Sequence, residues 1–220
     1  MAARGTTRAI ELAMARTENF AVESMVDTLV ALRNGADTYT VAAACREAAL
    51  SFVNDAPYWG KAELAMWLLG SYSFAAVDVG DENAPTSRPT LREIDVRTVH
   101  DLIDRARAEV LDSLEQLRDG DGAANIAFKM ISSGFVARSV DADGVAGWVP
   151  TTKARRLADR VLSLFVADCM MRPSDYEQTL STCAVCERAG FDALARRREV
   201  CHRHGGVAAT IPAGEHFAAA

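Results

Sequence analysis

Residues 183–204 read CAVCERAGFDALARRREVCHRH, and this stretch decides how the C-terminal part of the chain folds. It holds a C-x2-C pair, Cys183 and Cys186, and after fourteen residues a C-x2-H pair, Cys201 and His204. Thiolate and imidazole are the ligands that zinc prefers, and four of them close a tetrahedral structural site. So short a segment cannot fold on a core of its own, and we therefore predict that one structural zinc ion organises it.

The pattern leaves two alternatives open. His202 directly follows Cys201 and could replace His204 as the fourth ligand, although C-x2-H repeats the geometry of the first pair better. Glu187 lies next to Cys186 and could act as a general base if the zinc were catalytic. A catalytic zinc keeps one position for water, however, and four protein ligands favour a closed structural ion.

The composition is that of an ordinary globular protein. Half of the residues are hydrophobic and a quarter are charged, which excludes a disordered or collagen-like body. The first ten residues lack the apolar core of a signal peptide, and the most apolar stretch, 64–79, is too short and too interrupted to span a bilayer. Three of the five cysteines lie at metal-ligand spacing, which suits a reducing compartment. We therefore expect a cytoplasmic protein with no membrane association.

The net charge of −6 is unevenly distributed. Residues 1–150 carry 14 Lys and Arg against 22 Asp and Glu, whereas residues 151–173 carry 5 against 2. The acidic body would repel phosphate, so any contact with nucleic acid must come from the later third. The basic side chains there are Lys153, Arg155, Arg156, Arg160, Arg196, Arg197 and Arg198.

Residues 1–77 are predicted to form consecutive amphipathic helices. Apolar residues recur at helical spacing over 17–33 and 38–53. The following helix, 61–76, is apolar around most of its circumference, which is typical of a central helix in a bundle. Residues 78–90 are acidic and contain two prolines and a glycine, so we predict that they form a linker.

The rest of the chain combines helices with one β-hairpin. Residues 91–173 are predicted to form a long helix to about 118, a short helix over 123–133, strands 135–140 and 145–149, and a basic helix that begins at 150–152 and ends at 171. The turn between the strands, DADG at 141–144, is a hairpin signal. Residues 174–204 form the predicted zinc-binding module, and 205–220 form a flexible tail.

The short helix, the hairpin and the following basic helix resemble part of a winged-helix domain. The resemblance is carried by ISSGFVAR at 131–138, DADG at 141–144 and WVPT at 148–151. It implies a recognition helix followed by a two-stranded wing, and hence DNA binding. The helix that would read DNA offers only Asn125, Lys129 and a few serines, whereas specific readers commonly place Arg, Asn or Gln there.

No constellation typical of an enzyme accompanies these elements. The chain contains neither a nucleotide-binding glycine loop nor a nucleophile elbow. His100 lies one helical turn from Asp104, which could orient a general base, but no nucleophile is tied to the pair. Cys45 and Cys169 lie in apolar helical stretches and are predicted to be core residues.

We predict a mainly α-helical bundle with one β-hairpin, winged-helix-like in that part, and a small C-terminal zinc-binding module. The predicted function is that of a zinc-stabilised cytoplasmic binding protein, a non-enzymatic adaptor or regulatory subunit that acts through protein–protein contacts. The first alternative is a winged-helix-like DNA-binding transcription regulator with an accessory structural zinc site. The second alternative is a zinc-dependent hydrolase.

Overall fold

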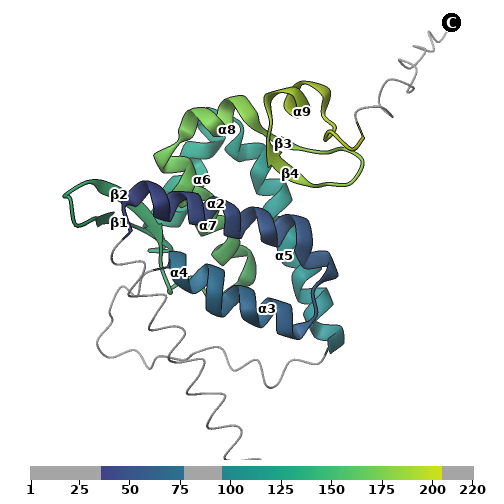
Figure 1. Cartoon of the computed structure of the whole chain (residues 1–220), viewed down its shortest axis with the longest axis horizontal. Helices are drawn as coiled ribbons and strands as arrows, with labels where there is room; N and C mark the ends of the chain where they lie inside the picture. Colours follow the sequence, from purple (N-terminus) through teal and green to yellow (C-terminus); the bar gives the residue numbers. More distant parts are fainter. Residues whose placement is uncertain (1–35, 77–95, 205–220) are drawn as a thin grey trace, which may run out of the picture.

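The computed structural model describes residues 36–76 and 96–204 of the 220-residue chain (Figure 1). The predicted helix over 17–33, the linker over 78–90 and the tail over 205–220 lie outside the described residues. The prediction of a mainly helical fold with a β-hairpin is confirmed.

The elements follow one another as a helical body and then a small C-terminal unit (Figure 1). The body consists of α2 (Thr38–Asp55), a 3-10 turn (Ala56–Tyr58), α3 (Lys61–Trp67), a π-helical turn (Leu68–Tyr72), α4 (Ser73–Ala75), α5 (Val96–Leu117), α6 (Gly120–Ser132), the strands β1 (Val136–Val140) and β2 (Ala146–Pro150), and α7 (Leu157–Met171). The C-terminal unit consists of α8 (Pro173–Thr179), β3 (Leu180–Thr182), β4 (Ala189–Phe191) and α9 (Ala193–Arg198). Within the described parts of the chain, no helix is long and apolar enough to cross a membrane.

Helix α7 lies at the centre of the body. Eleven of its 15 residues are buried, and it packs against α2, α5, α6 and β2. The prediction that 61–76 forms the central helix is wrong. That stretch is broken by the π-helical turn, and Met66 on α3 is 60% exposed. Its apolar residues surround the helix because some pack on α2 while others line a surface groove.

The hairpin confirms the turn predicted at 141–144. Strands β1 and β2 pair antiparallel, with Val136 opposite Pro150 and Val140 opposite Ala146. The Asp141 carboxylate accepts the N–H groups of Asp143 and Val145 at 3.1 and 2.8 Å, and Gly144 takes the positive φ of 81° that the turn requires.

The start of the basic helix was predicted too early. The Thr151 N–H donates to the Phe135 carbonyl (2.9 Å) and its hydroxyl donates to the Gly134 carbonyl (2.6 Å), so the hairpin continues through the predicted helix start. Helix α7 begins only at Leu157, and Lys153, Arg155 and Arg156 therefore precede it. Its end at Met171, before Pro173, is confirmed.

The two cysteines outside the C-terminal module belong to the core, as predicted. Cys45 on α2 is fully buried and Cys169 on α7 is 7% exposed. Burial raises the pKa of the Cys169 thiol to about 12, so this group remains a protonated, unreactive thiol at neutral pH.

Candidate metal centre

The structure brings together the four side chains that the sequence singled out. One sulfur or nitrogen atom of each of Cys183, Cys186, Cys201 and His204 lies within 4.8 Å of all the others. Cys183 Sγ is 3.4 Å from His204 Nδ1, Cys201 Sγ is 3.3 Å from the same nitrogen, and the sulfur atoms of Cys186 and Cys201 are 3.8 Å apart. The cluster could therefore hold one metal ion.

These separations fit the edges of a tetrahedron. With ordinary zinc bond lengths, two sulfur ligands would lie about 3.8 Å apart, and a sulfur and a nitrogen about 3.6 Å apart. His202 is exposed and is not part of the cluster, so the alternative histidine is not the one that faces the three sulfur atoms.

The first ligand pair sits on a tight turn at the tip of the β3–β4 hairpin. The Glu187 N–H donates to the Cys183 carbonyl (2.8 Å), and the Cys183 N–H donates to the Arg188 carbonyl (2.9 Å). Glu187 adopts a φ of 54°, in the left-handed region, which bends the chain so that both sulfur atoms face one point. In the second pair the His204 N–H donates to the Cys201 carbonyl (2.9 Å), which closes a similar turn.

The thiols of the first pair are electrostatically unequal. Burial opposes the charged form of Cys183, but backbone N–H groups of Cys201, Cys186 and Val185 outweigh it and lower the pKa of this thiol to about 5. Burial raises the pKa of Cys186, where the neighbouring sulfur atoms also oppose a further negative charge. A divalent cation would stabilise all of the thiolates together.

Glu187, the candidate general base of a catalytic zinc, is held by a residue of the body. Its carboxylate pairs with Arg107 on α5 at 2.7 Å, and the Arg107 Nε–H also donates to the Val53 carbonyl on α2 at 2.8 Å. Arg107 thereby ties the first ligand turn to two helices. No feature of the sequence identifies this contact, because the two partners lie 80 residues apart.

Two further side chains, those of Asn54 and Arg188, join the C-terminal unit to the body at the end of α2. The Asn54 side chain donates to the Ala189 carbonyl at 3.0 Å and accepts the Ala189 N–H at 2.8 Å. It thus bonds both backbone groups of Ala189, as the backbone of a paired strand does. Arg188 reaches the Asn54 carbonyl and the Asp55 carboxylate, both at 3.3 Å. The metal-ligand turn is therefore fixed against α2 and α5 as well as by its own hydrogen bonds.

A buried ion network lies beneath β4. Asp168 on α7 is fully buried and accepts hydrogen bonds from Arg46 Nε (2.7 Å), Arg172 Nε (2.8 Å) and the Tyr176 hydroxyl (2.8 Å). The Arg46 guanidinium also lies 3.9 Å from the centre of the Phe191 ring. No sequence pattern marks these residues, since an isolated Arg and an isolated Asp carry no local signal.

Some of the basic side chains proposed for phosphate contact are bonded to other residues of the chain, and others are exposed. Arg156 pairs with Glu109, with the closest atoms 2.6 Å apart, and Arg196 donates to the carbonyls of Tyr176 and Leu180. Arg160 donates to the Ala154 carbonyl at 2.8 Å and lies against the Tyr72 ring, and burial lowers its pKa. The side chains of Lys153, Arg155, Arg197 and Arg198 are exposed, and Arg156 is exposed as well, beside its ion pair with Glu109.

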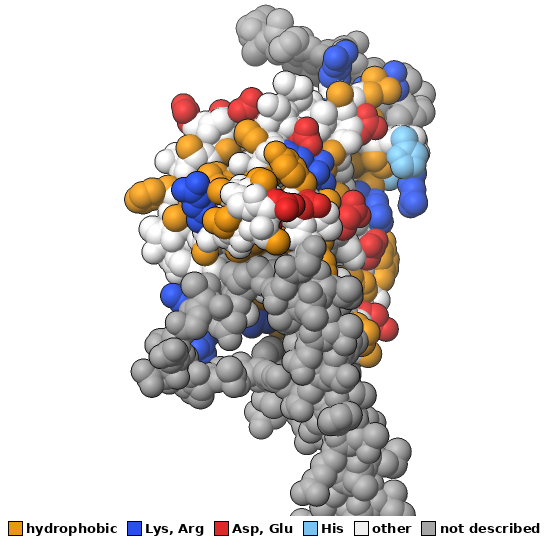
Figure 2. Space-filling model, turned by 60° about the vertical axis from the view of Figure 1, so that its left-hand side comes forward, with side chains coloured by type: hydrophobic (Ala, Val, Ile, Leu, Met, Phe, Trp, Pro, Cys, Tyr) orange, Lys and Arg blue, Asp and Glu red, His pale blue; other side chains and the backbone are white. Residues whose placement is uncertain are grey.

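The face shown in Figure 2 carries no continuous basic surface, since acidic, basic and hydrophobic side chains are interspersed over it. His100 and Asp104 on α5 are both exposed, as on an ordinary solvated helix face. Comparisons with protein-family models, with curated proteins and with solved structures each found no match to this chain.

Proposed function

We propose that this chain is a zinc-stabilised binding protein, an adaptor or regulatory subunit that acts through contacts with another protein. The closed set of four ligands is the observation that carries the proposal. Three sulfur atoms and one imidazole nitrogen supply every corner of a tetrahedron, so a metal held there has no position for a substrate or a reactive water.

The same donor set supports zinc as the metal. Three thiolates and one imidazole suit a borderline-soft ion without a strong geometric preference, whereas magnesium and calcium take oxygen ligands. Three cysteines at metal-ligand spacing, with no disulfide among the described residues, suit a reducing compartment, and we propose a cytoplasmic location on that ground.

We assign the partner surface to the outer face of α9. Leu194 is 52% exposed, and Arg197 and Arg198, three and four residues later, lie on the same side of the helix and are exposed as well. The Asp192 carboxylate caps the helix by accepting the N–H groups of Leu194 and Ala195. An aliphatic side chain beside two arginines on one face of a helix suits an acidic protein segment with an apolar residue.

DNA binding is the second candidate. It is supported by Asn125 and Lys129, which are exposed on α6, and by Arg138, which is exposed on the adjoining hairpin. The acidic body opposes it, and Arg156 and Arg160 are already engaged within the chain.

Affinity purification of the full chain from native extract distinguishes the two candidates. We expect Arg197→Glu combined with Arg198→Glu to lose the co-purifying protein, while Lys153→Glu combined with Arg155→Glu retains it, with or without nuclease. Loss of the partner on nuclease treatment, and in the Lys153/Arg155 variant only, would identify a nucleic-acid-binding protein and reject the adaptor.

Cobalt substitution tests the closed site. A cobalt-loaded protein is expected to show the intense visible bands of a tetrahedral ion with thiolate ligands, and added azide or cyanide should leave them unchanged. Bands that shift on addition of a small anion would reveal an exchangeable position and support a hydrolase instead.

A further inference from the structure

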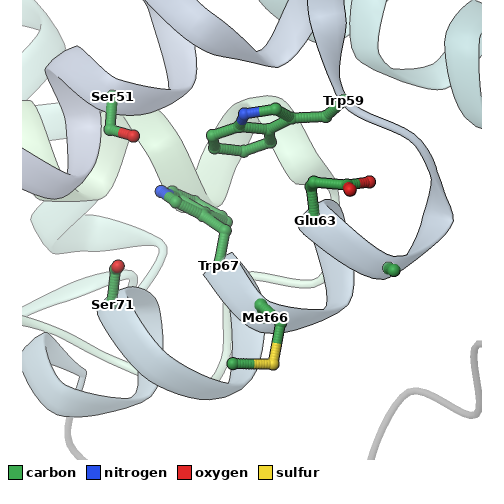
Figure 3. A pocket seen from close by; sticks show the side chains of 7 residues that line it. Ser51, Trp59, Glu63, Met66, Trp67 and Ser71 are labelled. Carbon is green, nitrogen blue, oxygen red and sulfur yellow. The ribbon is translucent and has the colours of Figure 1, made fainter.

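A groove of about 360 Å³ lies along α3 and the second half of α2, at the other end of the body from α9 (Figure 1). Its lining consists of Ser51, Trp59, Ala62, Glu63, Met66, Trp67 and Ser71. Figure 3 shows the two indoles one above the other, with Glu63 at one end of the groove and the two serines at the other. None of these residues belongs to the metal centre.

Contacts with the protein interior fix the positions of the two tryptophans that line the groove. Trp67 is only 4% exposed and its indole N–H donates to the Ala48 carbonyl at 2.9 Å. Phe52 packs between the helices, with its ring centre 5.2 Å from Trp67 and 6.0 Å from Trp59. The two indoles are 6.3 Å apart and tilted by 42°, which leaves them splayed and not stacked flat. The groove is therefore formed before any ligand arrives.

Two features of α3 mark this place as unusual. Met66 is 60% exposed, although a methionine beside two tryptophans could be buried at little cost. The helix then passes into a π-helical turn at Leu68–Tyr72, a rare element that is frequent at functional sites. This turn presents Ser71 to the end of the groove.

The charge of the groove is negative. Among the described residues that line it, Glu63 alone is charged, and its carboxylate is exposed while one of its oxygens accepts the Gly60 N–H at 2.9 Å. Glu47 is also exposed and lies one helical turn before Ser51 on α2, so it follows the same side of that helix. The described lining residues include no Lys or Arg that would neutralise this carboxylate.

We infer that this groove binds an organic cation, namely a quaternary ammonium group or the alkylated ammonium or guanidinium group of a side chain. The partly exposed Trp59 indole attracts such cations through its ring quadrupole, and Glu63 supplies the counter-charge. The apolar surface of Met66 and Trp59 suits the methyl or methylene groups that surround the charge. The groove is remote from the metal centre, so this inference does not depend on the proposed function.

Paired probes of equal shape and different charge test the inference. Choline and its neutral isostere 3,3-dimethyl-1-butanol are titrated into the metal-loaded full chain, and intrinsic tryptophan fluorescence and calorimetry are recorded. We expect choline to bind with a Kd on the order of millimolar and the alcohol to bind at least about fivefold more weakly. N-acetyl-trimethyllysine methylamide and N-acetylarginine methylamide extend the series, and tighter binding of either one than of choline identifies a protein side chain as the source.

Variants locate the site. Glu63→Gln keeps an acceptor for the Gly60 N–H, and it should weaken choline binding about threefold or more while binding of the alcohol is unchanged. Trp59→Leu should abolish choline binding. Glu115→Gln, at an exposed position on α5 outside the groove, is the matched control and should bind as the unmodified chain does. Equal affinity for choline and the alcohol, an unchanged choline Kd in Glu63→Gln, or no binding of any probe at 100 mM would overturn the inference.

Discussion

Replacement of Asp168 by Asn is expected to be among the most destabilising single changes in the body. The carboxylate is fully buried on α7 and faces two cationic side chains, Arg46 and Arg172, and the Tyr176 hydroxyl. An asparagine would keep one acceptor oxygen, but its NH2 group would point at a guanidinium donor. Both arginines would then lose their shared counter-charge.

The size of the effect follows from the exposure of the partners. Removal of one member of a buried ion pair typically costs about 3–5 kcal/mol. Here Arg46 keeps a second partner in Asp175 at 2.8 Å, and the Arg172 side chain is 28% exposed and can be hydrated. We therefore expect the lower end of that range, about 3 kcal/mol, which corresponds to a fall in Tm of about 6–12 °C for a domain of this size.

Urea denaturation and thermal melting, both followed by far-UV circular dichroism, measure the change. Asp175→Asn is the matched control, because its carboxylate is 45% exposed and Asp168 continues to neutralise Arg46. That variant should lose no more than about 1 kcal/mol. If Asp168→Asn cost no more than Asp175→Asn, the buried network would not stabilise the fold as described.

Two further predictions concern the metal and the pH. Removal of the metal by a chelator, or the substitution Cys183→Ser, should unfold the ligand-bearing segment and leave the helical body folded. Structural zinc contributes on the order of 10 kcal/mol to the folding of isolated fingers. Hydrogen bonds such as those of Asn54 contribute only about 1 kcal/mol each and cannot replace it. Rapid tryptic cleavage at Arg197 with unchanged helical circular dichroism is the expected result, and collapse of the whole chain would contradict it. Burial raises the pKa of the Cys169 thiol to about 12 from an ordinary value of 9.0, so the unfolded chain releases this proton before the native state does. Stability should therefore fall as the pH rises from 9 to 12, and Cys169→Ala should make this part of the stability curve flatter.

Local features were predictable because their causes are local. The C-x2-C and C-x2-H spacings place two ligands on one turn, and the Asp141–Gly144 segment satisfies its own backbone by short-range hydrogen bonds. The core positions of Cys45 and Cys169 followed from apolar neighbours at helical spacing. In each case, residues within a few positions of one another decide the outcome.

The errors arose where distant residues decide. The stretch 61–76 is as apolar as a central helix, but part of that apolar surface faces the groove, and α7 fills the centre instead. Phosphate contact by the basic residues before and within α7 stays a prediction, but the sequence did not show that Arg156 pairs with Glu109 from another helix or that Arg160 lies against the Tyr72 ring. A charge pattern along the chain does not show which charges meet after folding.

The sequence by itself determined the helical class, the hairpin turn and the four candidate ligands, because short-range backbone geometry and ligand spacing dictate them. Only the tertiary structure decided how the ligand turn is held against the body. Arg107 meets Glu187 across 80 residues, and Arg46 meets Asp168 across 122 residues. Such ion pairs form only when packing brings the two charges together, and no residue near either partner in the chain specifies that meeting.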